Sequence, residues 1–186
     1  MKIKKVFFAH SGGAQGSAGQ GSFDLVLSLK KELRNEFEIH YPLIDGPEDP
    51  SYQKWKNLLA KEFKNLNEPV ILIGHSLGGS VLLKYISEEK PDIYISSLYL
   101  VATPQWGKNG WGIEEFELRE NFEHELGEIE KVYLYHCKED SIVPFKHLNF
   151  YKKAFPNAIV RVLDGTDHVF SNGLPELVSD IKLNKS

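Results

Sequence analysis

Short runs of apolar and β-branched residues recur along the chain. Runs that stay apolar over consecutive positions are typical of strands covered on both faces, as in a parallel sheet. They predict strands over residues 5–9, 37–41, 70–73, 97–101, 132–135 and 159–163.

Between these runs, apolar residues recur at the three- and four-residue spacing of a helix with one buried face. The clearest case runs from Trp55 to Leu66, with Ser51 as its candidate N-cap. Ser22 precedes a similar segment, and Pro144 stands where a further helix would begin. The apolar positions of the predicted helices are Phe23, Val26, Leu27 and Leu33; Trp55, Leu58, Leu59, Phe63 and Leu66; Val81, Leu82, Tyr85 and Ile86; Leu148, Tyr151 and Phe155; and Leu174, Leu177, Val178 and Ile181.

The predicted elements follow one another as βαβαβαβ, then an irregular stretch over residues 103–126, then βαβα. This alternation predicts an α/β protein with a doubly wound, mostly parallel sheet of about six strands. Ligands of such sheets bind at the carboxyl ends of the strands, so functional residues are expected just after the apolar runs. The chain has 186 residues, and we expect a single domain over residues 1–186.

Composition and charge exclude several classes of function. The formal net charge is −4, so no basic surface is expected to attract nucleic acid. No segment approaches the roughly 20 apolar residues of a membrane span, and the apolar run at 6–9 is too short for a secretory signal. The lone Cys137 allows no internal disulfide, which fits a reducing compartment. We therefore expect a cytoplasmic protein with no nucleic-acid or membrane partner.

The segment 74–78, G-H-S-L-G, follows the third predicted strand and precedes an apolar helix. G-x-S-x-G in this position is typical of a very tight strand-to-helix turn, which lifts a serine hydroxyl out of the sheet. Glycine on either side relieves the crowding, and the helix N-terminus favours negative charge at the reacting oxygen. Ser76 is therefore a candidate nucleophile. The alternative is a glycine-rich turn with an incidental serine.

A nucleophilic serine needs a base, and the base needs an acid to orient it. After a G-x-S-x-G nucleophile, the acid and then the histidine follow along the chain. Residues 138–144, K-E-D-S-I-V-P, come after the fifth predicted strand and offer Glu139 and Asp140. Residues 164–168, D-G-T-D-H, come after the sixth and offer His168 as the base, although a surface histidine is the alternative.

These motifs resemble the α/β-hydrolase superfamily. They are G-H-S-L-G-G at 74–79, D-x-x-V-P at 140–144 and D-H at 167–168. The small size and the opening V-F-F-A-H-S-G-G at 6–13 resemble its compact branch, which includes the small serine hydrolases related to retinoblastoma-binding protein nine. The resemblance implies a three-layer α/β-hydrolase fold without the first two antiparallel strands of larger members, and with a minimal cap.

The resemblance also implies roles for single residues. Asp140 occupies the aspartate of D-x-x-V-P and is preferred over Glu139 as the acid, while Asp167 is interpreted as a loop residue. Two backbone N–H groups are expected to form an oxyanion hole. One belongs to Leu77, and for the other the resemblance favours Ser11, in the loop after the first strand.

Two further parts of the chain are expected to border the substrate. Gly12 lets the loop backbone approach the substrate closely, while His10 is expected to support that loop through hydrogen bonds. Residues 103–126 are expected to lie over the nucleophile as a small cap, with Trp106 and Trp111 as candidate substrate-binding residues. The aromatic residues of this stretch, which are Trp106, Trp111, Phe116 and Phe122, either line an acyl or leaving-group pocket or anchor the loop to the core.

The acidic run over residues 114–130 predicts a solvated helix face. The remaining histidines show no metal-ligand spacing such as H-E-x-x-H, so neither a metal nor a cofactor is expected.

We therefore expect a serine hydrolase that cleaves a small acyl ester through Ser76, Asp140 and His168 and an acyl-enzyme intermediate. Thioester or amide hydrolysis would use the same machinery. The main rival is a non-catalytic module on a hydrolase scaffold, which would bind a protein partner. A nucleotide site at residues 11–21, with Asp45 as a ribose acid, is disfavoured because neither G-x-G-x-x-G nor G-x-x-x-x-G-K-[ST] occurs.

Overall fold

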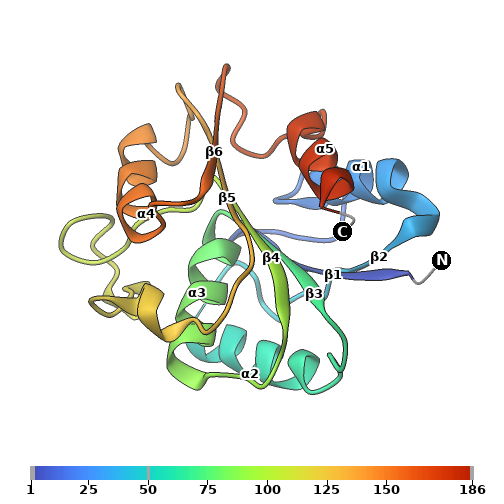
Figure 1. The fold of residues 1–186 in the computed structure, drawn as a ribbon. Coiled ribbons are helices and arrows are strands. Elements are labelled where there is room, and N and C mark those ends of the chain that lie inside the picture. Colours follow the sequence, from blue (N-terminus) through green and yellow to red (C-terminus); the bar gives the residue numbers. More distant parts are fainter. Residues whose placement is uncertain (1–2, 50, 185–186) are drawn as a thin grey trace.

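The computed structural model describes residues 3–49 and 51–184, which form a β-sheet with helices on both of its faces (Figure 1). The strands are β1 (Lys4–Ala9), β2 (Phe37–His40), β3 (Val70–His75), β4 (Ile95–Val101), β5 (Val132–Cys137) and β6 (Ile159–Leu163). Their order is β2-β1-β3-β4-β5-β6, and every neighbouring pair is parallel. The predicted doubly wound sheet of about six strands is confirmed.

The strand order reverses between β1 and β3, because the chain passes from β1 to the edge strand β2 and then returns to the other side of β1. A doubly wound sheet opens a crevice for ligands at such a point, outside the carboxyl ends of the two strands. The loops after β1 and β3 therefore meet at this crevice. The predicted domain over residues 1–186 includes residues 1–2, 50 and 185–186, which lie outside the described residues, and it stays a prediction.

Burial explains the continuous apolar runs of β1 and β3. Every residue of β3 is buried, as are the last four residues of β1. Strand β6 lies at the edge of the sheet, and its Ile159 and Val162 are exposed. The apolar pattern therefore predicts β6 correctly, although these two side chains are exposed.

Five helices complete the layers: α1 (Phe23–Leu33), α2 (Tyr52–Phe63), α3 (Leu77–Glu89), α4 (Leu148–Ala154) and α5 (Pro175–Leu183). Helices α1 and α5 pack on one face of the sheet, and α2, α3 and α4 pack on the other (Figure 1). None of the helices in the described part of the chain combines the length and apolar character that crossing a bilayer requires.

Of the two serines that directly precede predicted helices, Ser51 caps its helix and Ser22 does not. Ser51 caps α2 as predicted, because its side chain accepts the N–H of Lys54 at 3.3 Å. Ser22 precedes α1 but makes no capping bond, because its hydroxyl bonds to the Ser11 N–H and to the His75 ring instead. Pro144 opens a short 3-10 helix, Phe145–His147, that leads into α4.

The stretch between β4 and β5 is mostly irregular. The predicted helix face over residues 114–130 is wrong, because only two short 3-10 helices form there, Glu114–Phe116 and Phe122–Glu125. Each has one buried aromatic residue, Phe116 or Phe122, packed in the core on the α3 side of the sheet.

Two glycines allow the backbone of β3 and α3 to pack at very short range. A Cβ on Gly74 would lie 2.4 Å from the Cα of Gly79, and a Cβ on Gly78 would lie 2.0 Å from the carbonyl oxygen of Ala9. Real Cβ atoms do not approach backbone this closely. Any larger residue at 74 or 78 would therefore push α3 away from the sheet.

We predict that Gly74→Ala lowers the free energy of unfolding by about 1–3 kcal/mol, the usual cost of overpacking a tight interior. Gly112→Ala is the matched control, because a Cβ there meets no atom within 4 Å and the residue does not have a positive φ. The control should change stability by less than about 0.5 kcal/mol. Denaturant unfolding of both variants checks this, and equal losses would contradict the packing argument.

Candidate active site

Ser76 occupies the turn between β3 and α3 in a strained backbone conformation. Its φ is 52° and its ψ is −124°, a region that non-glycine residues rarely adopt. The N–H of Ser76 donates to the carbonyl of Val101 in β4 at 2.8 Å, and its carbonyl accepts the N–H of Gly79 at 3.0 Å. These bonds hold the turn on the sheet at the start of α3, as the sequence predicts.

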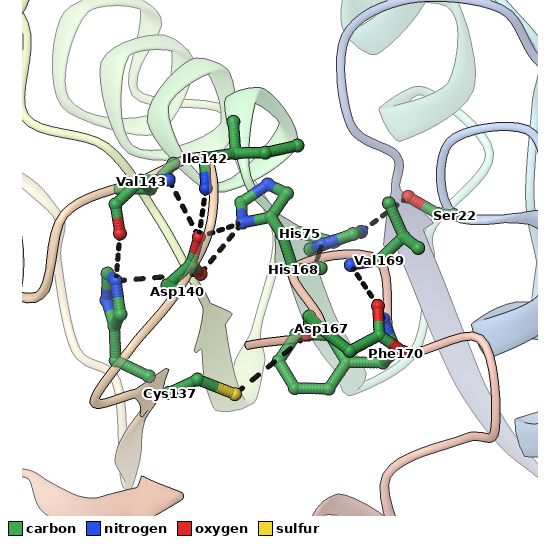
Figure 2. A network of polar contacts seen from close by, with 11 residues as sticks. Ser22, His75, Cys137, Asp140, Ile142, Val143, Asp167, His168, Val169 and Phe170 are labelled. Atoms are coloured by element: carbon green, nitrogen blue, oxygen red, sulfur yellow. Dashed lines mark hydrogen bonds and ion pairs between the residues drawn. The ribbon is translucent and has the colours of Figure 1, made fainter. Parts of the chain in front are cut away.

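Asp140 and His168 form a buried pair at the ends of β5 and β6. The Nδ1 of His168 lies 3.0 Å and 2.8 Å from the two carboxylate oxygens of Asp140 (Figure 2). The carboxylate also accepts the N–H groups of Ile142 at 2.9 Å and Val143 at 2.7 Å. Because a carboxylate accepts, Nδ1 carries the ring proton and Nε2 is left with a lone pair.

Asp140 is held in its charged form. Burial alone would raise the pKa of its carboxyl, but the hydrogen bonds from His168 and from the N–H groups of Ile142 and Val143 hold that pKa below its ordinary value. The side chain has no exposed surface. The carboxylate is therefore available as the acceptor of the Nδ1 proton of His168.

The two competing carboxylates play no part in this pair. Glu139 is exposed, next to Asp140 on the same loop. Asp167 faces its own loop, where it accepts the N–H groups of Val169 at 3.0 Å and Phe170 at 3.1 Å. The interpretation of Asp167 as a loop residue agrees with these contacts.

Ser76 and His168 line the same open pocket, which has a volume of about 470 Å³. Within residues 3–49 and 51–184, no hydrogen bond joins the Ser76 hydroxyl to the His168 ring. Bonds of this kind are often long until substrate binds, so their absence does not exclude the pair from chemistry. The pocket is lined by Ser11, Gly12, Gly21, Ser76, Leu77, Trp106, Trp111, Ile113, Glu115, Phe116, Ile142, His168 and Val169.

In the loop after β1, Ser11 already uses the N–H that the family resemblance assigns to an oxyanion hole. Its backbone N–H donates to the hydroxyl oxygen of Ser22 at 2.9 Å. This donor is therefore occupied, which argues against Ser11 as a source of the oxyanion hole. Gly12 lies beside Leu77, since a Cβ on Gly12 would be 3.4 Å from Leu77 Cδ2. Within the described residues, no backbone or side-chain group accepts the N–H of Gly12 or the N–H of Leu77.

Three of the four aromatic residues named in the stretch 103–126 line the pocket, and the fourth anchors the stretch to the core. Trp106, Trp111 and Phe116 line the pocket, and the rings of Trp106 and Trp111 meet edge to face at 5.2 Å. Phe122 points away from it and packs against Phe150 and Phe155, with ring centroids 5.9 Å and 6.0 Å apart. The segment therefore both borders the pocket and anchors itself to the core.

Several residues near the site escaped prediction from the sequence. Glu115, Ile113 and Ile142 line the pocket, although nothing in their spacing marked them. His75 and Ser22 bond to each other beneath the site (Figure 2). The only sequence signal for His75 is its place next to Ser76, and the only signal for Ser22 is its place directly before a predicted helix.

A buried histidine contacts the loop after β1. His10 is buried, its Nδ1 lies 2.8 Å from the carbonyl of Ser11, and it contacts Gln15 of the same loop. Burial lowers the pKa of His10 to about 4, which keeps the ring neutral.

Over the described residues, no group of three or more histidine, cysteine, aspartate or glutamate side chains is arranged to hold a metal ion.

Comparison with solved structures shows the fold. The ydeN gene product of B. subtilis is 18% identical, with 98% of each chain covered and a TM-score of 0.76. Est1E from Butyrivibrio proteoclasticus, with ferulic acid bound, is 16% identical over 98% of this chain and 88% of that one, with a TM-score of 0.73. A carboxylesterase structure from Nitrososphaera gargenis is 15% identical over 98% of this chain and 89% of that one, with a TM-score of 0.70. The predicted α/β-hydrolase fold is confirmed.

Comparison with protein families gives a more specific result. No curated protein matches the chain. A family model described as serine hydrolase matches residues 28–172, which is more than half of the sequence and contains Ser76, Asp140 and His168. The chain therefore belongs to the serine hydrolase family.

Proposed function

We propose that the chain hydrolyses small carboxylic esters, with Ser76 as nucleophile, His168 as general base and Asp140 as the acid that orients the histidine. One observation carries the proposal: the buried Asp140–His168 pair leaves Nε2 of the histidine as an acceptor at the pocket that Ser76 also lines. A serine on a strained turn, a base and a buried carboxylate are the parts that acyl transfer requires.

The reaction proceeds in two halves. Nε2 of His168 takes the proton of the Ser76 hydroxyl as its oxygen attacks the acyl carbon, and Asp140 stabilises the imidazolium that forms. The histidine then gives this proton to the departing alcohol, and an acyl-enzyme remains on Ser76. In the second half water loses a proton to His168 as its oxygen attacks the acyl carbon. The bond between that carbon and Ser76 Oγ then breaks, His168 returns the proton to Ser76, and the acid leaves.

The oxyanion that forms in each half needs two donors. We assign them to the N–H groups of Leu77 and Gly12, the first at the start of α3 and the second across from it in the pocket. The N-terminus of the 13-residue helix α3 adds partial positive charge on the same side. Removing one such donor typically costs about 10² to 10³ in rate.

The pocket walls favour uncharged acyl groups. Most of the lining is apolar, with Trp106, Trp111 and Phe116 from the stretch 103–126 and Ile142 from the loop after β5. Among the described residues, the lining includes the carboxylate of Glu115 and no lysine or arginine. An anionic substrate would therefore find no counter-charge. Esters are the simplest acyl substrates, and the similar folds of Est1E and a carboxylesterase support this class.

The direct test is hydrolysis of a panel of short esters, thioesters and amides by the wild type and by Ser76→Ala. We expect ester hydrolysis that is lost in Ser76→Ala and kept in Ser87→Ala. Ser87 is a matched control because it lies in α3, is buried about as deeply as Ser76, and its hydroxyl donates to the carbonyl of Lys84 in the same helix. A folded wild type that cleaves nothing in the panel would favour a binding module instead.

We predict that Asp140→Asn lowers kcat by about 10³ to 10⁴, because an amide neither fixes the histidine tautomer nor stabilises the imidazolium. Glu139→Gln removes the same charge one residue away, on an exposed side chain, and should leave kcat within about twofold. Steady-state kinetics on one ester compare the two. The reverse ranking would transfer the role to Glu139.

Substrate length gives a further prediction. We expect acetate and butyrate esters to be cleaved with higher kcat/KM than long-chain esters, since an open pocket of about 470 Å³ encloses too little apolar wall to offset the ordering of a long chain. The rate should also fall on acidification, because a protonated His168 cannot accept the serine proton. A series of nitrophenyl esters at several pH values checks both. A maximum at long chains would contradict the pocket assignment.

A further inference from the structure

His75 lies directly before Ser76 and joins two loops beneath the site. Its Nε2 lies 2.8 Å from the backbone carbonyl oxygen of His168, and its Nδ1 lies 2.8 Å from the hydroxyl oxygen of Ser22 (Figure 2). A carbonyl oxygen only accepts, so Nε2 carries the ring proton. Nδ1 must then accept, and the Ser22 hydroxyl is its donor.

The ring of His75 stays in this neutral form. The side chain is fully buried, and burial together with the nearby His168 lowers the pKa of His75 to about 3. The ring also packs against the ring of Phe170, with centroids 5.8 Å apart. One tautomer and one orientation of the ring therefore satisfy both hydrogen bonds.

Ser22 continues the same series of hydrogen bonds. Its hydroxyl oxygen accepts the N–H of Ser11, the residue directly before Gly12. The hydroxyl proton of Ser22 is donated to His75. The bonds thus run from the Ser11 N–H to Ser22 and on to His75, and from His75 to the backbone of His168. They connect the loop after β1 with the loop after β6, on opposite sides of Ser76.

All four residues of this connection are buried, with exposed fractions of 4% for Ser11, 0% for Ser22, 0% for His75 and 4% for His168. Water does not compete for the bonds, and a partner left alone would be an unsatisfied buried group. Neither Ser22 nor His75 lines the pocket. Their polar groups serve the loops and do not face a substrate.

We propose that Ser22 and His75 are positioning residues that fix the loop carrying Gly12 relative to the backbone carrying His168. This inference rests on the proposed function, because it assigns these loops the oxyanion donor and the base. Such groups must be held within about 0.5 Å of the productive geometry, and small displacements lower the rate of the chemical step. The substrate binds in its ground state to the apolar residues of the pocket wall, and these do not include Ser22 or His75.

The test compares Ser22→Ala, His75→Gln and their double variant with Ser87→Ala, which removes another buried hydroxyl far from the connection. On a butyrate ester we expect Ser22→Ala to lower kcat about 10-fold to 100-fold, below the loss of a whole oxyanion donor, with KM changed less than about threefold. The double variant should lose no more than the worse single variant, because the two residues act as one unit.

Two controls separate positioning from other roles. Thermal unfolding sets an assay temperature at which every variant is folded, and Ser87→Ala should keep the wild-type kcat there. The acid limb of the pH profile should stay in place in His75→Gln, because His75 is neutral and does not exchange protons with substrate. If His75→Gln does not fold, Ser22→Ala decides the case alone.

The outcomes are distinct. Wild-type kcat in Ser22→Ala, with Ser76→Ala inactive, overturns this inference and leaves the proposed function standing. Multiplying losses in the double variant, or a shifted acid limb in His75→Gln, also overturn it. Hydrolysis that survives in Ser76→Ala overturns the proposed function and this inference together.

Discussion

The site depends on the close backbone packing at the turn between β3 and α3. Ser76 holds a positive φ there, and such a conformation persists only where the surroundings fix it. The surroundings are the buried strand β3, the bond from Ser76 to Val101, and glycines that leave no room between strand and helix. The result is a serine held at the mouth of the crevice between β1 and β3.

The sheet also determines where the other site groups lie. Strands β5 and β6 pair in register up to Cys137 and Leu163, so the loops that follow them leave the sheet side by side. The N–H of Ser141 donates to the carbonyl of Thr166 at 3.2 Å and ties these loops together. Asp140 and His168 are thus 28 positions apart in sequence but in direct contact, with backbone N–H groups stabilising the carboxylate.

Much of this could be predicted from the sequence, because burial leaves a periodic pattern. Central strands such as β3 are buried throughout since helices cover both faces, and the position of a motif after a strand places it at the carboxyl edge. Hydrogen-bond partners from distant segments leave no such pattern. Ser22 looks like a helix cap, yet its hydroxyl bonds to Ser11 and His75. Likewise, no pattern in the sequence shows that the Ser11 N–H, which the family resemblance assigns to an oxyanion hole, donates to Ser22. The acidic stretch 114–130 has helical composition, but its aromatic residues pack into the core and onto the pocket instead.

The central claim is that Ser76 is a nucleophile activated by His168. Covalent trapping tests it most directly: the folded protein is treated with a fluorophosphonate, digested, and its peptides are mapped by mass spectrometry. The account predicts one added phosphonyl group, located on Ser76, with labelling greatly slowed in His168→Ala and absent after unfolding. A label on another residue, or labelling of Ser76 at the same rate without His168, would contradict it.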